Sequence, residues 1–182
     1  MSRIVHFVHQ SVDGFIEGPN GEFDWPAMGP ELSEYSQSLS DNAGAFLYGR
    51  VVWEMMVGFW PRAEELSDHP HDVAYAPLWR EKPKVVVSST LTGADWNTTV
   101  VSGPDELAKL KEESAGDLVL FGGAGLAATL TERGLIDEYQ IVVHPVVLGG
   151  GKPVFLDPER FDLRLAQTRT FGENVVLLRY ER

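Results

Sequence analysis

Residues 118–130, with the sequence LVLFGGAGLAATL, decide the fold of this chain. Four apolar residues predict a buried strand, and the glycines after them predict a sharp turn into a helix of small residues. Glycine lets backbone N–H groups approach an anion closely, and the start of a helix contributes about half a positive charge. The stretch therefore predicts a phosphate-binding turn, although tight packing of a helix on a sheet uses the same glycines.

Composition limits the class of protein. With 182 residues, the chain is expected to form one domain, 1–182, with a sizeable core. A formal net charge of -12 argues against a nucleic-acid partner, because phosphate backbones are bound through Lys and Arg. No cysteine is present, and His69 with His71 lack a diagnostic ligand spacing, so no metal site is predicted. Without a long apolar run or a signal-peptide pattern, we expect a cytoplasmic protein with no membrane partner.

Strands alternate with helices along most of the chain. The last two expected strands, 164–170 and 175–180, are joined by four residues and predict a β-hairpin. Residues 11–30 are too rich in Gly and Pro for a regular element, and 58–71 are expected to be irregular. This order predicts a three-layer α/β fold with a mostly parallel central sheet and an antiparallel C-terminal hairpin. The other expected strands are 3–10, 45–48, 84–88, 99–102, 118–121 and 138–144.

Two further strand ends carry residues suited to phosphate. Gly49 and Arg50 open a helix directly after a strand, and a guanidinium there can bind phosphate in a bidentate way. Because parallel strands end at the same edge of a sheet, these groups can meet and hold a 2′-phosphate, which favours NADP over NAD. A surface salt bridge for Arg50 and a plain turn for the hydroxyl residues are the alternatives. The hydroxyl groups follow the neighbouring strand, at Ser88, Ser89 and Thr90.

Gly123, Gly125 and Ala128 match the dinucleotide-binding pattern of glycine, any residue, glycine, two residues, glycine or alanine. A Rossmann domain needs more parallel strands after this motif, whereas here a hairpin ends the chain. The acidic ribose ligand is also missing, since His144 occupies its expected position. Glycines that bind a pyrophosphate within another α/β fold therefore fit the sequence better.

Short motifs follow one another in a specific order over nearly the whole chain: SVDG at 11–14, DW at 24–25, GR at 49–50 followed by WE at 53–54, SSTL at 88–91, GG at 122–123, DE at 137–138, and the glycine-rich residues 145–151. This order resembles the dihydrofolate-reductase-like superfamily. It is most similar to standalone members of the family named after the C-terminal reductase domain of the riboflavin-biosynthesis deaminase-reductase.

The resemblance implies a central sheet of eight or nine strands with NADPH bound across its C-terminal edge. It also implies a homodimer and hydride transfer to a small-molecule substrate, a heterocycle or a ribosylamine, as in 5-amino-6-(5-phosphoribosylamino)uracil reductase. When the family's binding residues are matched by position, the resemblance implies that the pyrophosphate is bound by Phe121, Gly122, Gly123, Ala124, Gly125 and Leu126. It implies that the 2′-phosphate side of the cofactor is bound by Gly49, Arg50, Val51, Val52, Ser88, Ser89 and Thr90. Val52 stands where the family usually has a hydroxyl residue.

The substrate side departs further from the family. Phe121 and Phe7 stand near positions where riboflavin-pathway reductases have glutamate and lysine, which favours an apolar or aromatic substrate. Asp13, in the Ser-x-Asp-Gly loop, and Glu31, at the start of the first helix, are the candidate catalytic residues, with a simple turn as the alternative for Asp13. The predicted substrate pocket comprises Asp13, Trp25, Trp53 and Phe121.

Two other functions are compatible with the sequence. One is a dihydrofolate reductase, for which the carboxylate at Glu31 or Glu34 would be the expected acid. The other is a nucleotide-binding dimer module without catalysis, which the changes at Phe7, Val52 and Phe121 would suit. NADPH-dependent reduction is the function that the motifs favour.

Overall fold

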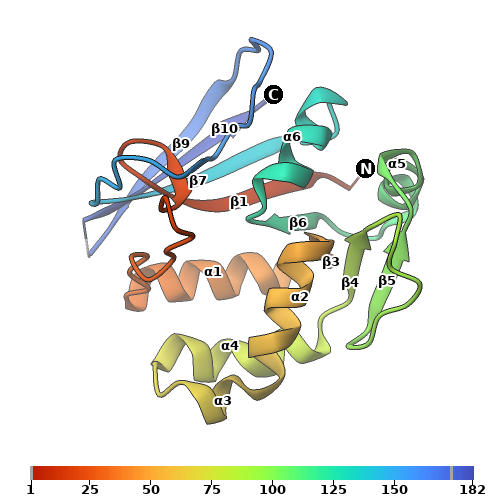
Figure 1. The fold of residues 1–182 in the computed structure, drawn as a ribbon, viewed down its shortest axis with the longest axis horizontal. Helices are drawn as coiled ribbons and strands as arrows, with labels where there is room; N and C mark the ends of the chain where they lie inside the picture. Colours follow the sequence, from red (N-terminus) through yellow and green to blue (C-terminus); the bar gives the residue numbers. More distant parts are fainter. Residues whose placement is uncertain (1, 173) are drawn as a thin grey trace.

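The computed structural model describes residues 2–172 and 174–182, and it contains an eight-stranded sheet with helices on both faces (Figure 1). The strands are β1 (Ile4–Ser11), β3 (Ala45–Gly49), β4 (Lys84–Val87), β5 (Thr98–Val101), β6 (Leu118–Phe121), β7 (Glu138–His144), β9 (Arg164–Phe171) and β10 (Val175–Glu181). Their order is β5-β4-β3-β6-β1-β7-β10-β9. Neighbouring strands from β5 to β7 in this order are parallel. Strand β10 is antiparallel to both of its neighbours, β7 and β9. The predicted mostly parallel sheet with a C-terminal hairpin is confirmed.

Helices form the two outer layers. They are α1 (Pro30–Asn42), α2 (Arg50–Phe59), the 3-10 turn η1 (Trp60–Arg62), α3 (Ala63–Leu66), α4 (Pro70–Glu81), α5 (Pro104–Glu113) and α6 (Ala124–Glu132). One core joins α1, α2 and α4 to the sheet through Leu32, Trp53 and Trp79, and a second core joins α5 and α6 through Leu107 and Leu130. Among the described residues, no helix has the length and apolar character needed to cross a bilayer.

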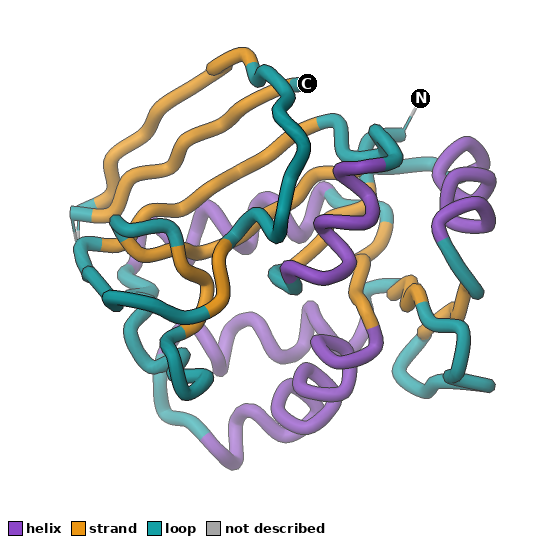
Figure 2. The backbone as a smooth tube through the Cα atoms, turned by 45° about the horizontal axis from the view of Figure 1, so that its top comes forward, coloured by secondary structure: helices purple, strands orange, loops and turns teal. Residues whose placement is uncertain are grey.

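The β9–β10 hairpin extends beyond the helical layers (Figure 2). Every residue of β9 except Phe171 is exposed, and β9 forms one outer edge of the sheet. The parallel strands, in contrast, are buried on both faces, since successive residues such as Ile4 and Val5 lie in the two different cores. Runs of apolar residues are expected in strands that helices cover on both faces.

Two expectations about loops are wrong. Residues 11–30 contain the short strand β2 (Phe15–Glu17), which pairs with β8 (Lys152–Pro153), and 58–71 contain η1, α3 and the start of α4. The partner of β2 is distant in sequence, so its pattern gave no local sign of pairing. The expected unusual backbone near 149–151 is present, because Gly151 has a φ of +127° and a Cβ there would overlap the carbonyl oxygen of Glu17.

Candidate functional site

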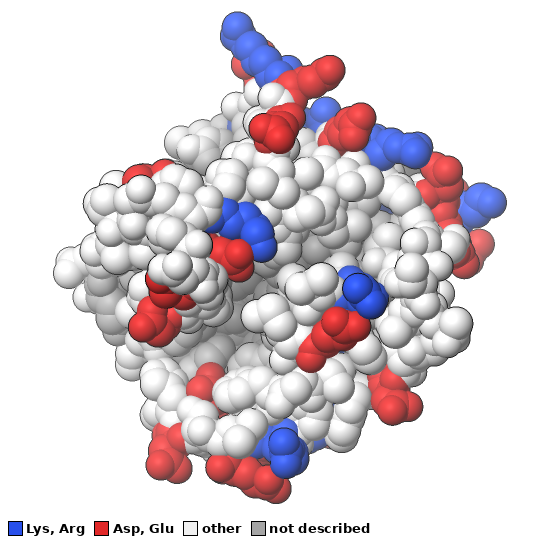
Figure 3. All heavy atoms as spheres, in the orientation of Figure 1, with Lys and Arg blue, Asp and Glu red and all other residues white. Residues whose placement is uncertain are grey.

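The carboxyl ends of β3, β6, β1 and β7 lie at one edge of the sheet, because these strands are adjacent and parallel. The residues at these ends are Gly49, Phe121, Ser11 and His144. The face that presents α2 and α6 is hollowed near its centre, and most atoms around the hollow are uncharged (Figure 3). In open α/β sheets, ligands bind outside this edge of the strands.

The structure brings the starts of α2 and α6 together at this edge. A Cβ added to Gly123 would lie 3.0 Å from Cγ2 of Val52, and one added to Gly49 would lie 3.4 Å from Cβ of Leu126. Among the described residues, neither helix has a side-chain cap at its start, so the first N–H groups of both helices are free of such a partner. Two partly positive helix starts therefore lie close together at this edge.

The glycine turn leaves open space in front of α6. Gly122 and Gly123 have φ angles of +58° and +73°, which residues with a side chain rarely adopt. A Cβ added to Gly122 or to Gly125 would meet no atom of the described chain within 4 Å. Packing within the described chain therefore does not explain the glycine at position 125.

Arg50 is the first residue of α2 and is exposed beside the glycine turn. Its Nη1 lies 3.7 Å from Oε1 of Glu54, one turn further along the helix, and both side chains are half exposed. Such a pair contributes little, about 0.3–0.5 kcal/mol, so it does not hold the guanidinium firmly. The surface salt bridge named as the alternative is therefore present, and phosphate binding by Arg50 stays a prediction.

Ser88 lies immediately beside this helix start, since β4 pairs in register with β3 at Val87 and Gly49. Its Oγ accepts hydrogen bonds from the N–H groups of Thr90, at 3.3 Å, and Leu91, at 3.1 Å. The hydroxyl of Ser88 therefore stabilises the turn. A plain turn was the alternative to phosphate binding for this residue. Ser89 and Thr90 are exposed at the same sheet edge, and their contact with a phosphate stays a prediction.

Asp13 links the loop after β1 to the loop after β7 through hydrogen bonds. Its carboxylate accepts hydrogen bonds from the N–H groups of Leu148, at 3.1 Å, and Gly149, at 2.8 Å. A hydrogen bond from Ser11, together with these N–H groups, lowers the pKa of Asp13. The carboxylate is stabilised in its charged form, whereas a general acid must carry a proton near neutral pH.

Two other predicted residues are Glu31 and Trp53. Glu31 is exposed in the first turn of α1, and its carboxylate lies beside Gly172 in the β9–β10 turn. Trp53 is buried in the core under α2, and its Nε1 lies 3.4 Å from Oγ1 of Thr98 in β5. The structure therefore places Glu31 beside the β9–β10 turn and Trp53 in the core that α2 covers.

An aromatic wall lies between the glycine turn and the loop of residues 11–30. The ring of Phe121 packs edge-on against Phe7, with centroids 5.9 Å apart, and Phe7 packs edge-on against His9 at 5.2 Å. Trp25 packs edge-on against His144 at 5.6 Å. Phe121 and Trp25 are half-buried, so a flat ligand can reach part of this wall.

The pair of His9 and His144 was not predicted from sequence. Nδ1 of His9 lies 2.8 Å from Nε2 of His144, and Nδ1 of His144 accepts a hydrogen bond from the N–H of Ala27 at 3.2 Å. Burial lowers the pKa of His9 to about 3 and that of His144 to about 4, so both rings are neutral at pH 7. The register of β1 and β7 is the signal that would have joined these residues. Within the described ranges, no group of three or more His, Asp or Glu side chains is placed to hold a metal ion.

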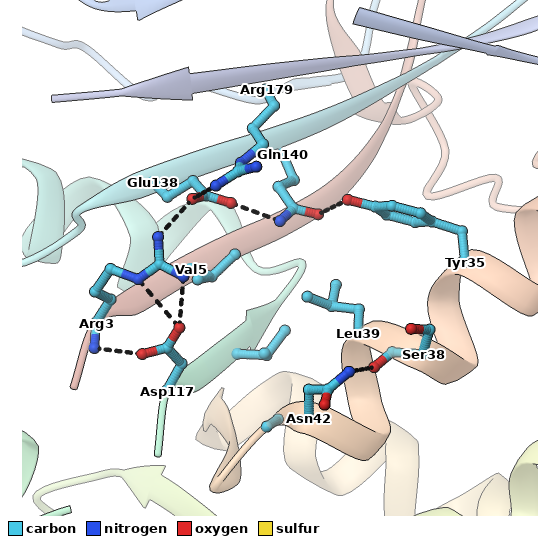
Figure 4. A pocket seen from close by; sticks show the side chains of 12 residues that line it. Arg3, Val5, Tyr35, Ser38, Leu39, Asn42, Asp117, Glu138, Gln140 and Arg179 are labelled. Atoms are coloured by element: carbon cyan, nitrogen blue, oxygen red, sulfur yellow. Dashed lines mark hydrogen bonds and ion pairs between the residues drawn. The ribbon is translucent and has the colours of Figure 1, made fainter. Parts of the chain in front are cut away.

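A separate pocket of about 270 Å³ lies at the opposite, amino-terminal edge of the sheet (Figure 4). The Glu138 carboxylate accepts hydrogen bonds there from Nη1 of Arg3, at 2.9 Å, Nη2 of Arg179, at 2.8 Å, and Nε2 of Gln140, at 2.6 Å. Gln140 in turn accepts from the Tyr35 hydroxyl at 2.8 Å. The polar groups of this pocket pair mainly with one another, which ties β1, β7, β10 and α1 together.

Glu138→Gln is expected to lower the free energy of unfolding by about 2 kcal/mol, since it leaves two guanidinium groups beside a neutral amide. The two arginines are partly exposed, which keeps the loss below that of a fully buried pair. Urea unfolding at pH 7 measures the change. Asp105→Asn is the matched control, because the Asp105–Arg133 pair is exposed and is expected to contribute under about 0.5 kcal/mol. Equal losses in the two variants would contradict a structural role for Glu138.

Comparison with known proteins places these features in a family. The chain is 35% identical to the uncharacterized protein YyaP of Bacillus subtilis, over 98% of this chain and 94% of that protein. It is 25% identical to the riboflavin biosynthesis protein RibD of Corynebacterium ammoniagenes, over 82% of this chain but only 44% of that protein. The structure of a putative riboflavin biosynthesis protein from Shewanella sp. PV-4 covers all of this chain with a TM-score of 0.76 and 22% identity.

A further solved structure is that of an enzyme whose reductase activity is named. A diaminohydroxyphosphoribosylaminopyrimidine deaminase/5-amino-6-(5-phosphoribosylamino)uracil reductase from Thermotoga maritima matches with a TM-score of 0.68 and 13% identity. The match covers 99% of this chain and 56% of that protein. The family model described as the RibD C-terminal domain matches residues 3–177. The chain therefore belongs to the RibD C-terminal domain family.

Proposed function

We propose that this protein is an NADPH-dependent reductase that transfers a hydride to a small heterocyclic or ribosylamine-type substrate. The observation that carries the proposal is the pair of uncapped helix starts, side by side at the carboxyl edge of the sheet, with open space beside Gly122 and Gly125. The Thermotoga maritima protein, whose name includes 5-amino-6-(5-phosphoribosylamino)uracil reductase, supports the same reaction type. The bound cofactor would supply the hydride.

The residues present fit a nicotinamide dinucleotide phosphate. The N–H groups at the start of α6, from Ala124 to Leu126, would hold the pyrophosphate, because no side chain among the described residues caps them and a bulky group can approach. Arg50 would hold the 2′-phosphate, with the exposed hydroxyls of Ser89 and Thr90 on the adjacent strand end. Val52 packs against Gly123 and so fixes the position of the two helix starts instead of donating a hydroxyl.

The substrate would lie against the accessible members of the aromatic wall, Phe121, Trp25 and His9, with the buried rings of Phe7 and His144 behind them. Phe121 is half-buried next to Gly122, so a flat ring on it would be close to the cofactor turn. Arginine and lysine are absent from these wall residues, which favours an uncharged or apolar ring over a phosphorylated one.

Titration with NADPH, followed by quenching of tryptophan fluorescence, tests the proposal. Arg50→Gln is expected to weaken NADPH binding by about 10- to 100-fold and to leave NADH binding unchanged, because only NADPH carries the 2′-phosphate. Arg133→Gln, at the far end of α6, is the matched control. No binding of NADPH or NADP⁺ at millimolar concentration by the unaltered protein would reject the proposed function.

The same proposal includes a cytoplasmic homodimer. The support for a dimer is β9, an outer edge strand whose first seven residues are exposed on both faces, Leu165 at 52% among them. Unpaired edges of this kind are normally covered or protected. Sedimentation equilibrium is expected to give twice the mass of the chain, and a monomer mass at micromolar concentration would contradict the dimer.

A further inference from the structure

The hydrogen bonds of the His9–His144 pair fix which nitrogen of each ring carries a proton. The backbone N–H of Ala27 can only donate, so Nδ1 of His144, 3.2 Å away, must accept and carries no hydrogen. The proton of a neutral His144 is then on Nε2, which donates to Nδ1 of His9 at 2.8 Å. The proton of a neutral His9 is in turn on its Nε2.

A charge on either ring would break this chain of hydrogen bonds. A proton on Nδ1 of His144 would face the N–H of Ala27, and a proton on Nδ1 of His9 would face the N–H of His144. Burial, with the nearby His144 and His71, also disfavours the charged form of His9 by lowering its pKa to about 3. The pair is thus built to stay neutral, with one N–H at its outer end.

That outer N–H lies on the substrate side of the sheet. His9 follows Phe7 by two positions on β1, so both side chains project from the same face, with ring centroids 5.2 Å apart. Strand β1 lies between β6, which ends at the glycine turn, and β7, which ends at His144. His9 is partly buried, and its Nε2 has no hydrogen-bond partner within the part of the chain that the structure describes.

We propose that the Nε2–H of His9 donates a hydrogen bond to an acceptor atom of the substrate, a carbonyl oxygen or an unprotonated ring nitrogen of a flat, uncharged heterocycle. His144 is a positioning residue, because it fixes the tautomer of His9 without contacting the substrate. The inference rests on the proposed function and narrows its substrate class. The contact is one of recognition, and no proton leaves the imidazole.

The surroundings of His9 agree with this substrate class. The aromatic wall offers ring faces and edges from Phe7, Phe121 and Trp25. It offers no free hydrogen-bond donor from these side chains, since Nε1 of Trp25 already donates to the carbonyl of Glu22 at 3.2 Å. A flat ring that stacks here finds a donor at His9. A neutral donor favours a neutral acceptor, whereas a carboxylate or phosphate would find no positive charge beside it.

Lumazine and indole are suitable probes for binding to the protein saturated with NADP⁺, measured by calorimetry at pH 7. Both are flat heterocycles, but lumazine carries carbonyl acceptors, whereas indole has an N–H donor and no comparable acceptor. His9→Phe keeps an aromatic ring and removes the donor, so we expect it to weaken lumazine binding about tenfold and to leave indole binding unchanged. His9→Gln keeps an N–H donor and is expected to restore part of the loss.

Two controls separate this inference from the function on which it rests. NADPH affinity is expected to be unchanged in His9→Phe, and His69→Phe, at an exposed histidine before α4, is expected to leave lumazine binding unchanged. If NADPH binds the unaltered protein but lumazine does not, or if His9→Phe binds lumazine equally well, the inference is overturned and the reductase proposal stands. If no nicotinamide nucleotide binds, both are overturned.

Nitrogen NMR of protein labelled with ¹⁵N-histidine tests the tautomers without any ligand. The proton is expected on Nε2 in both His9 and His144 at pH 7, and His144→Phe is expected to give His9 a mixture of tautomers. A proton on Nδ1 of His9 in the unaltered protein would contradict the assignment, because the outer nitrogen would then be an acceptor.

Discussion

Gly125→Glu is expected to weaken NADPH binding by at least about 100-fold while the protein stays folded. The new side chain would begin in the open space in front of α6 and bring a negative charge to the proposed pyrophosphate position. The helix itself should gain stability, since glycine is a poor helix former and an acidic residue suits a helix start. Fluorescence titration with NADPH and urea unfolding measure the two effects separately.

Gly58→Glu is the matched control for this change. Gly58 lies in α2, is exposed, and has no atom of the described chain within 4 Å of an added Cβ, so the same substitution there should spare NADPH binding. Gly125→Ala should have a smaller effect, because it adds only a methyl group. Unchanged NADPH affinity in Gly125→Glu would show that the cofactor does not use the start of α6.

Acid is expected to destabilise the protein before its carboxylates titrate. Burial lowers the pKa of His6 to about 4, of His9 to about 3 and of His144 to about 4. The unfolded chain therefore binds more protons than the folded one as the pH falls below 6.5. Each histidine then costs up to about 1.4 kcal/mol per pH unit, so the free energy of unfolding should fall by about 4 kcal/mol between pH 6.5 and 5. Urea unfolding across this range measures the fall.

His6→Phe isolates one part of this effect. His6 is buried beside Tyr139, and neither of its ring nitrogens has a hydrogen-bond partner within the described residues. The substitution should reduce the fall in stability between pH 6.5 and 5 by about a third, whereas Thr129→Val on the surface of α6 should not change it. A stability that stays constant over this range in the unaltered protein would contradict neutral burial of the three rings.

The sequence predicted the elements whose signals are local. Residues 118–121 and the glycines after them identify a strand, a turn and a helix start, and the structure has β6 and α6 at these positions. The pairing of β2 with β8 depends on residues more than a hundred positions apart, so its signal lies in no single stretch. The helices in 58–71 are short pieces that pack against α4, which overrides their mixed local pattern.

In the candidate site, too, local signals could be read from the sequence and long-range contacts could not. Gly49 and Gly122 could be joined from sequence alone, because each is at the end of a buried strand that continues into a helix. His9 and His144 could not, since their contact depends on β1 and β7 being neighbours in one register. Trp53 suited a ligand wall by residue type, but the orientation of α2 turns its ring into the core.

The two loops beside the carboxyl edge are fastened to each other at several points. Asp13 accepts from Leu148 and Gly149, the N–H of Val12 donates to the carbonyl of Val146 at 2.8 Å, and the N–H of Val154 donates to Gly14 at 3.0 Å. Because these hydrogen bonds link the two loops, we expect them to move together as one unit relative to the ends of β1 and β7. His9 and His144 lie beside those strand ends, so we expect a movement of the linked loops to change the alignment of the two imidazole rings, and we expect Asp13→Ala to weaken this coupling.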